Sequence, residues 1–396
     1  MAENKDKKVL NVPNLRFPEF EGEWQDTRLK EISKFSKERL NSIELSCSNY
    51  VTTENMLQDY KGIVSATNLP TNTNVIKFSK GDVLLSNIRP YLKKVWYADR
   101  NGGCSADVFV FKALPICNSN FLHHVIANDR FIKFVMGGAK GVKMPRGDKE
   151  QMITYKVGLP CIEEQKKIAT LLSLLDERIS TQNKIIDKLQ SLIKGIMVEL
   201  QKQGQNKGNW RNVLLSKVLT ERDERNTNLY QVFSVSVSRG VINQVDYLGR
   251  SFAARDTSKY NVVHYGDLVY TKSPTGAYPY GIVKQNLNQE NVAVSPLYGV
   301  YIPNSLSVGT YLHEYFRSEI NTHNYLHPLI QKGAKNTINI TNQRFLENSV
   351  PMPICANELL LISKLLLSFN DKIKYQQSIL QQYQKQKQYL LRQMFI

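Results

Sequence analysis

Residues 162–200 read IEEQKKIATLLSLLDERISTQNKIIDKLQSLIKGIMVEL, and this stretch decides the fold. From Ile168 onward apolar residues recur at alternating steps of four and three positions, which predicts a long helix with one seam that packs against a partner helix. At about 1.5 Å per residue, a helix over 163–203 would be roughly 60 Å long, about twice the diameter of a small domain. The seam consists of Ile168, Leu172, Leu175, Ile179, Gln182, Ile186, Leu189 and Ile193.

The same seam recurs 194 residues later, with a polar Gln at the same place in both copies. Only Lys387 further interrupts the second copy. A duplicated unit that closes on its own copy has pseudo-two-fold symmetry, so we expect the two helices to run antiparallel. In the expected register, residues whose numbers sum to 562 face each other, so Gln182 lies near Leu380 and Gln376 near Ile186. Two amphipathic helices packed on separate cores remain the alternative. The second seam consists of Ile362, Leu366, Phe369, Ile373, Gln376 and Leu380.

The repeat extends over the whole chain, because further landmarks recur in one order at offsets of 185 to 195 residues. They are Trp24 and Trp210, Gly81-Asp82 and Gly266-Asp267, Gly138-Ala139 and Gly333-Ala334, and Leu159-Pro160 and Met352-Pro353. The sequence therefore predicts an α+β protein in which two similar mixed α/β globular domains are joined by two long antiparallel coiled-coil helices. The expected boundaries are 1–159 and 208–352 for the globular domains, 160–207 for the first helix and linker, and 353–396 for the second helix.

Turn residues and β-branched or aromatic runs predict the elements inside the globular domains. Strands are expected at 82–86, 105–111, 230–237 and 292–295, and helices at 121–136 and 311–330. The stretch Gly204–Asn209 is expected to break the first long helix.

Composition points to a polyanionic partner. The chain has 396 residues with 52 Lys and Arg against 35 Asp and Glu, a net charge of +17, which favours nucleic acid over an unspecialised basic surface. No apolar run is long enough to cross a membrane, and residues 1–8 lack the apolar core of a signal peptide, so a cytoplasmic location is expected. The five cysteines form no CxxC pair, which argues against a disulfide framework and a cysteine metal site.

Basic and aromatic loops recur at matching places in the two halves, after each Gly-Asp strand and after each Gly-Ala pair. Lys and Arg can hold phosphates or read guanine, Asn can pair with adenine, and aromatic rings can stack, so these loops are candidate nucleic-acid contacts. In the first half the candidates are Arg89, Tyr91, Lys93, Lys94, Lys140, Lys143 and Arg146. In the second half they are Lys272, Thr275, Tyr278, Tyr280, Lys332, Lys335 and Asn336.

The chain shows no complete catalytic motif, so no catalytic or metal-ligating residue is expected. No Gly-Lys dipeptide is present, which excludes the phosphate loop of ATP-binding motors. Three patterns imitate active sites. His323 and His327 lack the Glu of a zinc helix, and Ser295-Pro296 lacks the second Pro of a methyltransferase loop. Asp148 with Glu164-Gln-Lys166 has the spacing of a nuclease motif, but Glu164 and Lys166 belong to the first turn of the long helix, where Glu complements the helix dipole.

The whole pattern resembles the specificity subunits of type I restriction-modification enzymes. The resemblance rests on Pro13–Phe17 before Glu23-Trp24, on the duplicated Gly-Asp strand, and above all on Leu159–Ile168, which is similar to the Pro-x-x-x-Glu-Gln-x-x-Ile start of the family's helix. The second copy departs from it, since the residue after Glu358 is Leu359 rather than Gln, and the loop at Gly137–Lys140 departs from the usual Gly-Thr-Gly.

The resemblance implies two target-recognition domains that each read one half of a split DNA site, with a spacing set by the helix pair. It also implies two methyltransferase subunits that use S-adenosylmethionine and two motor-nuclease subunits that use ATP and Mg, while this chain holds no cofactor. A coiled-coil scaffold whose basic domains bind RNA or another acidic partner remains open, and a stand-alone methyltransferase or nuclease ranks third.

Overall fold

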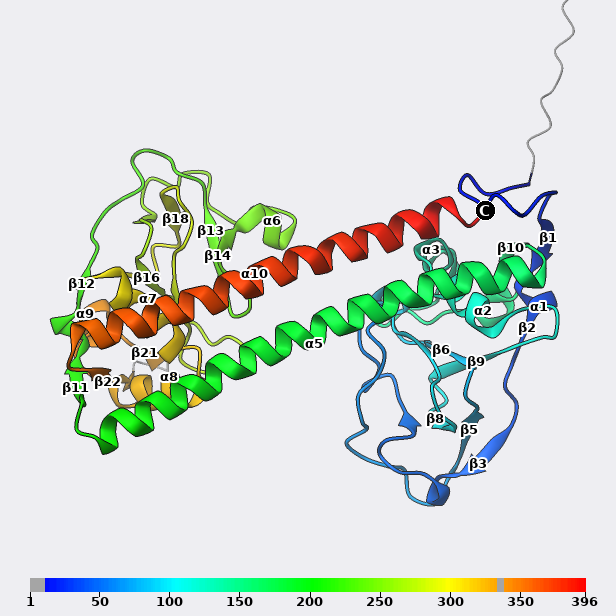
Figure 1. Ribbon diagram of the computed structural model, residues 1–396, viewed down its shortest axis with the longest axis horizontal. Coiled ribbons are helices and arrows are strands. Elements are labelled where there is room, and N and C mark those ends of the chain that lie inside the picture. The colour runs from blue at the N-terminus through cyan, green and yellow to red at the C-terminus, as the bar shows by residue number, and fades with distance from the viewer. Residues whose placement is uncertain (1–10, 333–337) are drawn as a thin grey trace, which may run out of the picture. The chain divides into compact units, whose positions relative to one another are not determined.

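The computed structural model describes residues 11–332 and 338–396 (Figure 1). The described chain divides into two units. Unit 1 comprises residues up to Lys184 together with Ser378–Ile396, and unit 2 comprises Ile185–Gln377. Both long helices therefore contribute one part to each unit.

Unit 1 is built around a four-stranded antiparallel sheet with the order β2-β9-β6-β7. Alternate residues of the central strands face opposite sides, as the two-residue period of a strand requires. Val83 and Leu85 join the core beneath the helices, whereas Leu84 joins a second core on the other face. The strands are β2 (Ser33–Phe35), β9 (Val108–Ala113), β6 (Val83–Ser86) and β7 (Val95–Tyr97).

The remaining elements of unit 1 flank this sheet. A second sheet has the order β3-β5-β8-β4, in which β4 runs parallel to β8, and β1 pairs with β10. These strands are β3 (Arg39–Asn41), β5 (Asn74–Phe78), β8 (Gly102–Cys104), β4 (Tyr50–Val51), β1 (Gln25–Arg28) and β10 (Lys156–Leu159). The helices are α1 (Leu29–Ile32), η1 (Ser42–Glu44), η2 (Pro90–Leu92), α2 (Ser119–Ile126), α3 (Asp129–Gly137) and α4 (Lys149–Met152).

Unit 2 repeats the plan. Its four-stranded antiparallel sheet has the order β12-β19-β16-β17, which matches β2-β9-β6-β7 strand for strand and confirms the internal repeat. The pair β11-β22 corresponds to β1-β10, and three further two-stranded sheets are β15-β18, β13-β14 and β20-β21. The strands are β11 (Trp210–Leu214), β12 (Leu219–Glu221), β13 (Phe233–Ser236), β14 (Gly240–Asn243), β15 (Asn261–Val263), β16 (Leu268–Tyr270), β17 (Val283–Gln285), β18 (Val292–Val294), β19 (Gly299–Pro303), β20 (Gln331–Lys332), β21 (Ile338–Asn339) and β22 (Ser349–Pro353).

The predicted strands at 82–86, 105–111, 230–237 and 292–295 correspond to β6, β9, β13 and β18, but both predicted helices were wrong in being continuous. The first is divided where the Asn128 side chain accepts a hydrogen bond from the Arg130 amide and starts α3. The second is divided where Ser318 caps the next helix in the same way. The helices of unit 2 are η3 (Leu215–Lys217), α6 (Gln244–Leu248), α7 (Leu306–Tyr315), α8 (Glu319–Leu326), η4 (His327–Leu329) and α9 (Asn342–Phe345).

The two long helices are α5 (Ile162–Asn206) and α10 (Ala356–Gln393), and every residue of the two seams is buried or half-buried. In unit 1 the end of α10 packs on the start of α5, because Leu391 and Met394 share one core with Ile168 and Leu172. Further along, Lys387 contacts Asp176, one residue from the position that the expected register assigns. Numbers fall along α10 as they rise along α5, so the predicted antiparallel pairing is confirmed. None of the helices in the described ranges is long and apolar enough to cross a membrane.

The first long helix ends within the predicted stretch Gly204–Asn209. Helix α5 continues to Asn206, and the turn comes at Gly208, whose φ is +69°. Gly204 has a different role, since a Cβ atom there would lie 2.2 Å from Cδ1 of Trp210. The glycine lets the indole pack against the last turns of the helix.

Gln165 explains why α5 begins with a Glu-Gln pair. Its side chain is 1% exposed and bonds three main-chain groups that lie before α2 and before α5 itself. Its Oε1 accepts from the Asn118 amide at 2.7 Å, and its Nε2 donates to the carbonyl oxygens of Ile116 at 3.1 Å and Pro160 at 2.9 Å. The amide therefore holds the entry to α2 on the first turn of α5.

We predict that Gln165→Ala destabilises unit 1 by about 2–3 kcal/mol, since three main-chain groups, in one buried and two part-buried hydrogen bonds, lose their partner at about 1 kcal/mol each. Urea denaturation followed by circular dichroism measures the change. Lys166→Ala, at an exposed neighbouring position, is the matched control and should leave the free energy of unfolding within about 0.5 kcal/mol of wild type. Equal midpoints for the two variants would contradict this role of Gln165.

Candidate nucleic-acid interface

Two basic loops predicted from distant parts of the sequence lie together in unit 1. The loop after β6 joins the segment 140–147 through a bridge between Ile88 and Arg146. The Arg89 amide donates to the Pro145 carbonyl oxygen at 2.8 Å, and Lys140 and Arg146 exchange two main-chain hydrogen bonds at 2.9 Å. The two loops thus form one continuous surface.

The first loop turns sharply at both ends of η2. Arg89 and Lys93 have φ values of +50° and +54°, a left-handed conformation that is uncommon for residues other than glycine. Tyr91 lies between them and is 48% exposed. Nε of Arg89 is buried and has no hydrogen-bond partner in the described chain. A backbone held in this form and an unpaired buried donor are features of a site that binds a ligand.

Most of the basic groups in this surface already have partners. Lys140 lies 2.6 Å from Asp148, Arg146 lies 3.3 Å from Asp107, and Lys93 lies 2.9 Å from Asp129. Lys94 donates to the Thr53 carbonyl oxygen at 2.6 Å. Lys143, in contrast, is exposed and has no partner among the described residues, so it is the cation best placed to meet a phosphate.

The two carboxylates that imitate a nuclease site have structural roles. Asp148 caps α4 by accepting from the Glu150 and Gln151 amides, and its bond to Lys140 lowers the pKa of its carboxyl. Glu164 is buried and accepts two hydrogen bonds at 2.8 Å from the Arg16 guanidinium. Each carboxylate therefore has a structural partner of its own.

The corresponding loop of unit 2 follows β16. Lys272 has a φ of +61°, and burial lowers the pKa of its ammonium group. Thr275 and Tyr278 exchange two main-chain hydrogen bonds around Gly276, whose φ is +56°. Tyr278 is only 5% exposed and its hydroxyl donates to the Arg317 carbonyl oxygen at 2.7 Å, so it anchors the loop and is removed from the candidate contacts.

Tyr280 belongs to an aromatic group at the end of this loop. Its ring lies 5.3 Å from the His323 ring and 6.0 Å from the His327 ring, and the two imidazoles stack at 5.2 Å. Both histidines are exposed. Of the other candidates, Lys332 lies in β20, while Lys335 and Asn336 lie outside the described residues.

One basic and aromatic surface of unit 2 was missed by the sequence analysis. Residues 245–252 are exposed throughout, and the Arg250 guanidinium lies 4.4 Å from the centre of the Phe252 ring. Arg239 lies 5.7 Å from the Tyr247 ring in the same way. These arginine and aromatic pairs are visible in the sequence. They do not recur at the matching place of the first half, so the internal repeat does not point to them.

A buried polar network lies behind the loop of unit 2 that Tyr278 anchors. Glu314 is 3% exposed and accepts from Asn370 at 2.8 Å and from Arg317 at 3.3 Å. Burial alone would raise the pKa of Glu314, but His313, Arg317 and Asn370 together hold it below its ordinary value. Nδ1 of His313 accepts from the Gln285 amide at 2.9 Å, and burial lowers the pKa of this imidazole to about 4.

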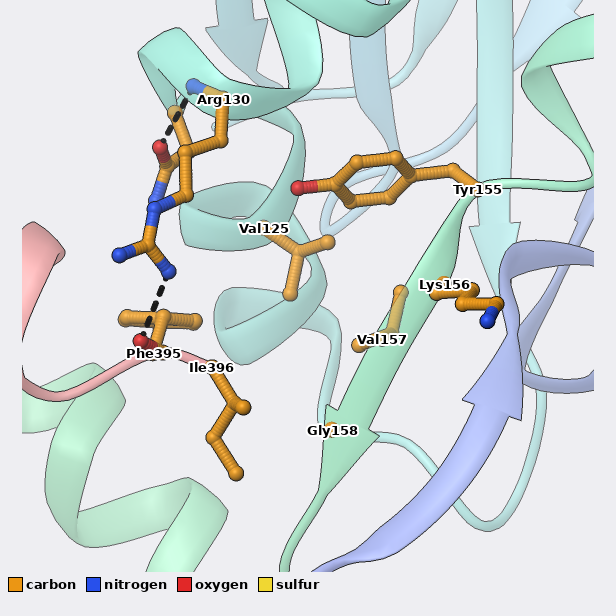
Figure 2. A pocket seen from close by; sticks show the side chains of 9 residues that line it. Val125, Arg130, Tyr155, Lys156, Val157, Gly158, Phe395 and Ile396 are labelled. Atoms are coloured by element: carbon orange, nitrogen blue, oxygen red, sulfur yellow. Dashed lines mark hydrogen bonds between the residues drawn. The ribbon is translucent and has the colours of Figure 1, made fainter. Parts of the chain in front are cut away.

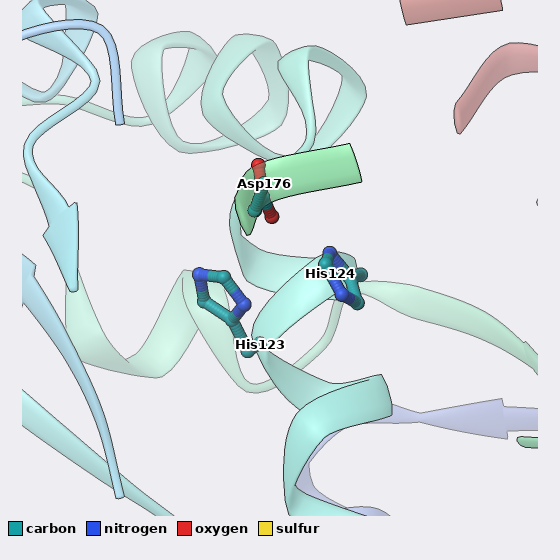
Figure 3. A group of neighbouring side chains, drawn as sticks. All are labelled: His123, His124 and Asp176. Carbon is teal, nitrogen blue, oxygen red and sulfur yellow. The ribbon is translucent and has the colours of Figure 1, made fainter. Parts of the chain in front are cut away.

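Only one group of side chains in the described chain has the composition of a metal site. Ring nitrogens of His123 and His124 and a carboxylate oxygen of Asp176 lie within 4.8 Å of one another in unit 1 (Figure 3). The Lys387 ammonium, however, lies 2.5 Å from Oδ1 of Asp176. Burial and the Lys387 charge lower the pKa of His123 to about 3. The cluster thus already contains its cation, and a divalent ion would meet like charge.

Two hollows lie in unit 1, one small and one open. A cavity of about 10 Å³ lies beside Arg130, whose guanidinium donates to the Phe395 carbonyl oxygen at 3.0 Å (Figure 2). The guanidinium also donates to the Arg392 carbonyl oxygen at 3.3 Å. This site holds the end of α10 and has no room for a ligand. A shallow polar groove of about 340 Å³ is lined by side chains that include Arg39, Asn49 and Lys77.

Comparison with known proteins agrees with this arrangement. A family model described as type I restriction modification DNA specificity domain matches residues 21–191. The specificity subunit of the type I restriction enzyme MjaVIII from Methanocaldococcus jannaschii is 28% identical over 217 residues, which cover 50% of this chain and 46% of the relative. The match thus spans about half the length of that relative.

A solved structure has the same fold. The S subunit of a type I restriction-modification system from M. genitalium superimposes with a TM-score of 0.62 at 12% identity, over 97% of this chain and 99% of that one. At this identity the likeness concerns the fold alone. It confirms the predicted class, two mixed α/β domains with two long helices.

We predict that unit 2 loses stability as the pH falls from about 6.5 to about 4, because unfolded His313 binds a proton in this range and the folded imidazole does not. Above pH 6.5 the neutral His313 makes its full contribution to the free energy of unfolding. Urea midpoints at pH 7.5 and 5.0 measure it, and His313→Gln should reduce the difference between them. His323→Gln, which removes an exposed imidazole, is the matched control. An unchanged pH dependence in His313→Gln would contradict the assignment.

Proposed function

We propose that this chain is a type I restriction-modification specificity subunit, the class described by the family model that matches residues 21–191, and that it is the sequence-specific DNA-binding subunit of such a complex. It recognises a bipartite DNA site, with one half read by each globular domain. The chain is a non-catalytic subunit, and its partners supply the chemistry.

The observation that carries this proposal is the repetition of one sheet with one basic loop. The orders β2-β9-β6-β7 and β12-β19-β16-β17 are the same, and the loops at Arg89 and Lys272 leave the equivalent strands β6 and β16. Both loops have a basic residue with positive φ at their start. Two equivalent basic surfaces on one chain suit two half-sites on one duplex.

The two target-recognition domains are residues 1–159 and 208–352, and the helices 160–207 and 353–396 set the spacing between the half-sites. The proposed contacts exclude Tyr278 and include the two arginine and aromatic pairs of unit 2, since Arg suits phosphates and base edges alike. They are Arg89, Tyr91, Lys93, Lys94, Lys140, Lys143, Arg146, Lys272, Thr275, Tyr280, Lys332, Lys335, Asn336, Arg239 and Arg250.

The proposed partners are double-stranded DNA, two methyltransferase subunits and two motor-nuclease subunits. S-adenosylmethionine, ATP and Mg belong to those subunits. The two carboxylates that imitate a nuclease site have structural partners, which supports a role in recognition: Asp148 caps a helix and Glu164 is held by Arg16.

Mapping N6-methyladenine in host DNA tests the function. We expect a split motif that appears only when this chain is expressed together with its methyltransferase subunit. Removal of residues 183–189 and 377–383 shortens each long helix by one heptad, about 10 Å, and should shorten the spacer of the motif by about three base pairs.

The control variant combines Lys188→Ala with Gln381→Ala, two exposed positions inside the deleted segments, and keeps the length of both helices. It should leave the spacer unchanged. The absence of any split motif with the intact chain would favour an RNA-binding or scaffold protein. An unchanged spacer in a folded, active deletion variant would refute the helix pair as the ruler.

Loss of one unpaired cation tests the surface itself. Lys143→Ala should weaken binding of the assembled methyltransferase complex to all duplexes alike and reduce the slope of log affinity against log salt by about 1. Lys30→Ala, at an exposed position in α1, is the matched control and should leave the slope unchanged. Equal slopes for both variants would remove Lys143 from the interface.

A further inference from the structure

Lys387 is a charged residue in a seam that is otherwise mostly apolar, with Gln376 as its other polar member. Its residue exposure is 8%, and its ammonium lies 2.5 Å from Oδ1 of Asp176 on the facing helix. The pair lies beside His123 and His124 of α2, which Figure 3 shows around the Asp176 carboxylate. The pair therefore joins α5, α10 and the globular part of unit 1.

The surroundings make this pair difficult to separate. His124 is fully buried, and burial together with the charges of His123 and Lys387 lowers its pKa, so it is neutral near pH 7. Neutral imidazoles cannot replace the Asp176 carboxylate as a counter-charge. Removal of one partner from a buried ion pair leaves an uncompensated charge, which costs far more than the intact pair contributes to stability.

The internal repeat contains this pair only once. The offset of 194 residues relates Asp176 to Asn370 and relates Ile193 to Lys387. In unit 2, Asn370 donates to Glu314, and Ile193 is 1% exposed. The two helices have matching seams, but only one of the two equivalent places holds opposite charges.

Matching seams create an ambiguity that the charges can resolve. Because α5 and α10 share one apolar pattern, α10 could pair with α10 of a second chain, and α5 with α5, in the same antiparallel register. In the first arrangement Lys387 would face Asn370, and in the second Asp176 would face Ile193. The first arrangement buries the Lys387 charge without its partner, and the second deprives the partly exposed Asp176 carboxylate of its counter-charge.

We propose that Asp176 and Lys387 select the pairing of α5 with α10 and reject the pairing of either helix with its own copy in a second chain. Repulsion of wrong partners by unpaired buried charge is a general route to specificity. The inference concerns the assembly of this chain and stands whether or not the chain binds DNA.

Co-expression of the full chain with two different affinity tags tests the proposal. The variant Asp176→Asn with Lys387→Ile gives both places the residues of their symmetry-related positions. The fraction of protein that carries both tags after two purification steps should rise at least about tenfold over wild type. A second kind of dimer exchanges α10 between two chains but still pairs each α5 with an α10. Such dimers keep the charge pair, so wild type forms them as readily as the variant, and they do not contribute to the rise.

Two further variants keep the test decisive. Lys387→Met alone removes the barrier to pairing of α10 with α10 and leaves Asp176, whose side chain is 36% exposed, in contact with water, so it should also raise the mixed-tag fraction. The exchange Asp176→Lys with Lys387→Asp keeps opposite charges and should keep the fraction at the wild-type level. The proposal would be overturned if the folded double variant Asp176→Asn with Lys387→Ile, or the folded Lys387→Met variant, kept the mixed-tag fraction of wild type. It would also be overturned if the charge-exchanged variant Asp176→Lys with Lys387→Asp formed mixed-tag dimers as readily as the double variant without charges.

Discussion

The apolar seam between α5 and α10 is the interaction on which the rest of the structure depends. In unit 1, beyond the Asp176–Lys387 pair, it continues into the core of the globular part, where Phe395 stacks on Phe121 of α2 at a centroid distance of 5.3 Å. Burial of each such side chain stabilises the fold by about 1.5–3 kcal/mol. Because the end of α10 and the residues that follow it complete the core of the first globular part, the helix segments of unit 1 and that part form one compact unit.

Polar groups enter this apolar framework at a few places, and each has a defined partner. Gln165 bonds three main-chain groups, Asn370 donates to Glu314, and Asp176 pairs with Lys387. Buried hydrogen bonds and ion pairs add little net stability but tolerate only one geometry. These residues therefore fix the orientation of each globular part on its own segment of the long helices, which apolar contacts alone would leave less well defined.

The two copies of the sheet have diverged where they meet solvent. Unit 1 carries a second four-stranded sheet, whereas unit 2 carries the hairpin β13-β14 and α6 with its exposed arginine and aromatic pairs. Loops on a rigid scaffold can change without loss of the core, because their backbone is on the surface. A shared core with different loops is the arrangement expected of two domains that read different half-sites.

The sequence by itself determined the two seams, the internal repeat and the basic loops. A heptad period and a duplicated landmark are patterns in the order of residues, so they can be recognised without knowing which residues are in contact. Only the tertiary structure decided which distant residues meet. It joined the loops at Arg89 and Arg146, buried Tyr278 against Arg317, and moved the partner of Asp176 one residue from the expected register, to Lys387. Such contacts depend on how the chain closes on itself, and a residue's neighbours in sequence carry no signal of partners that packing supplies from elsewhere.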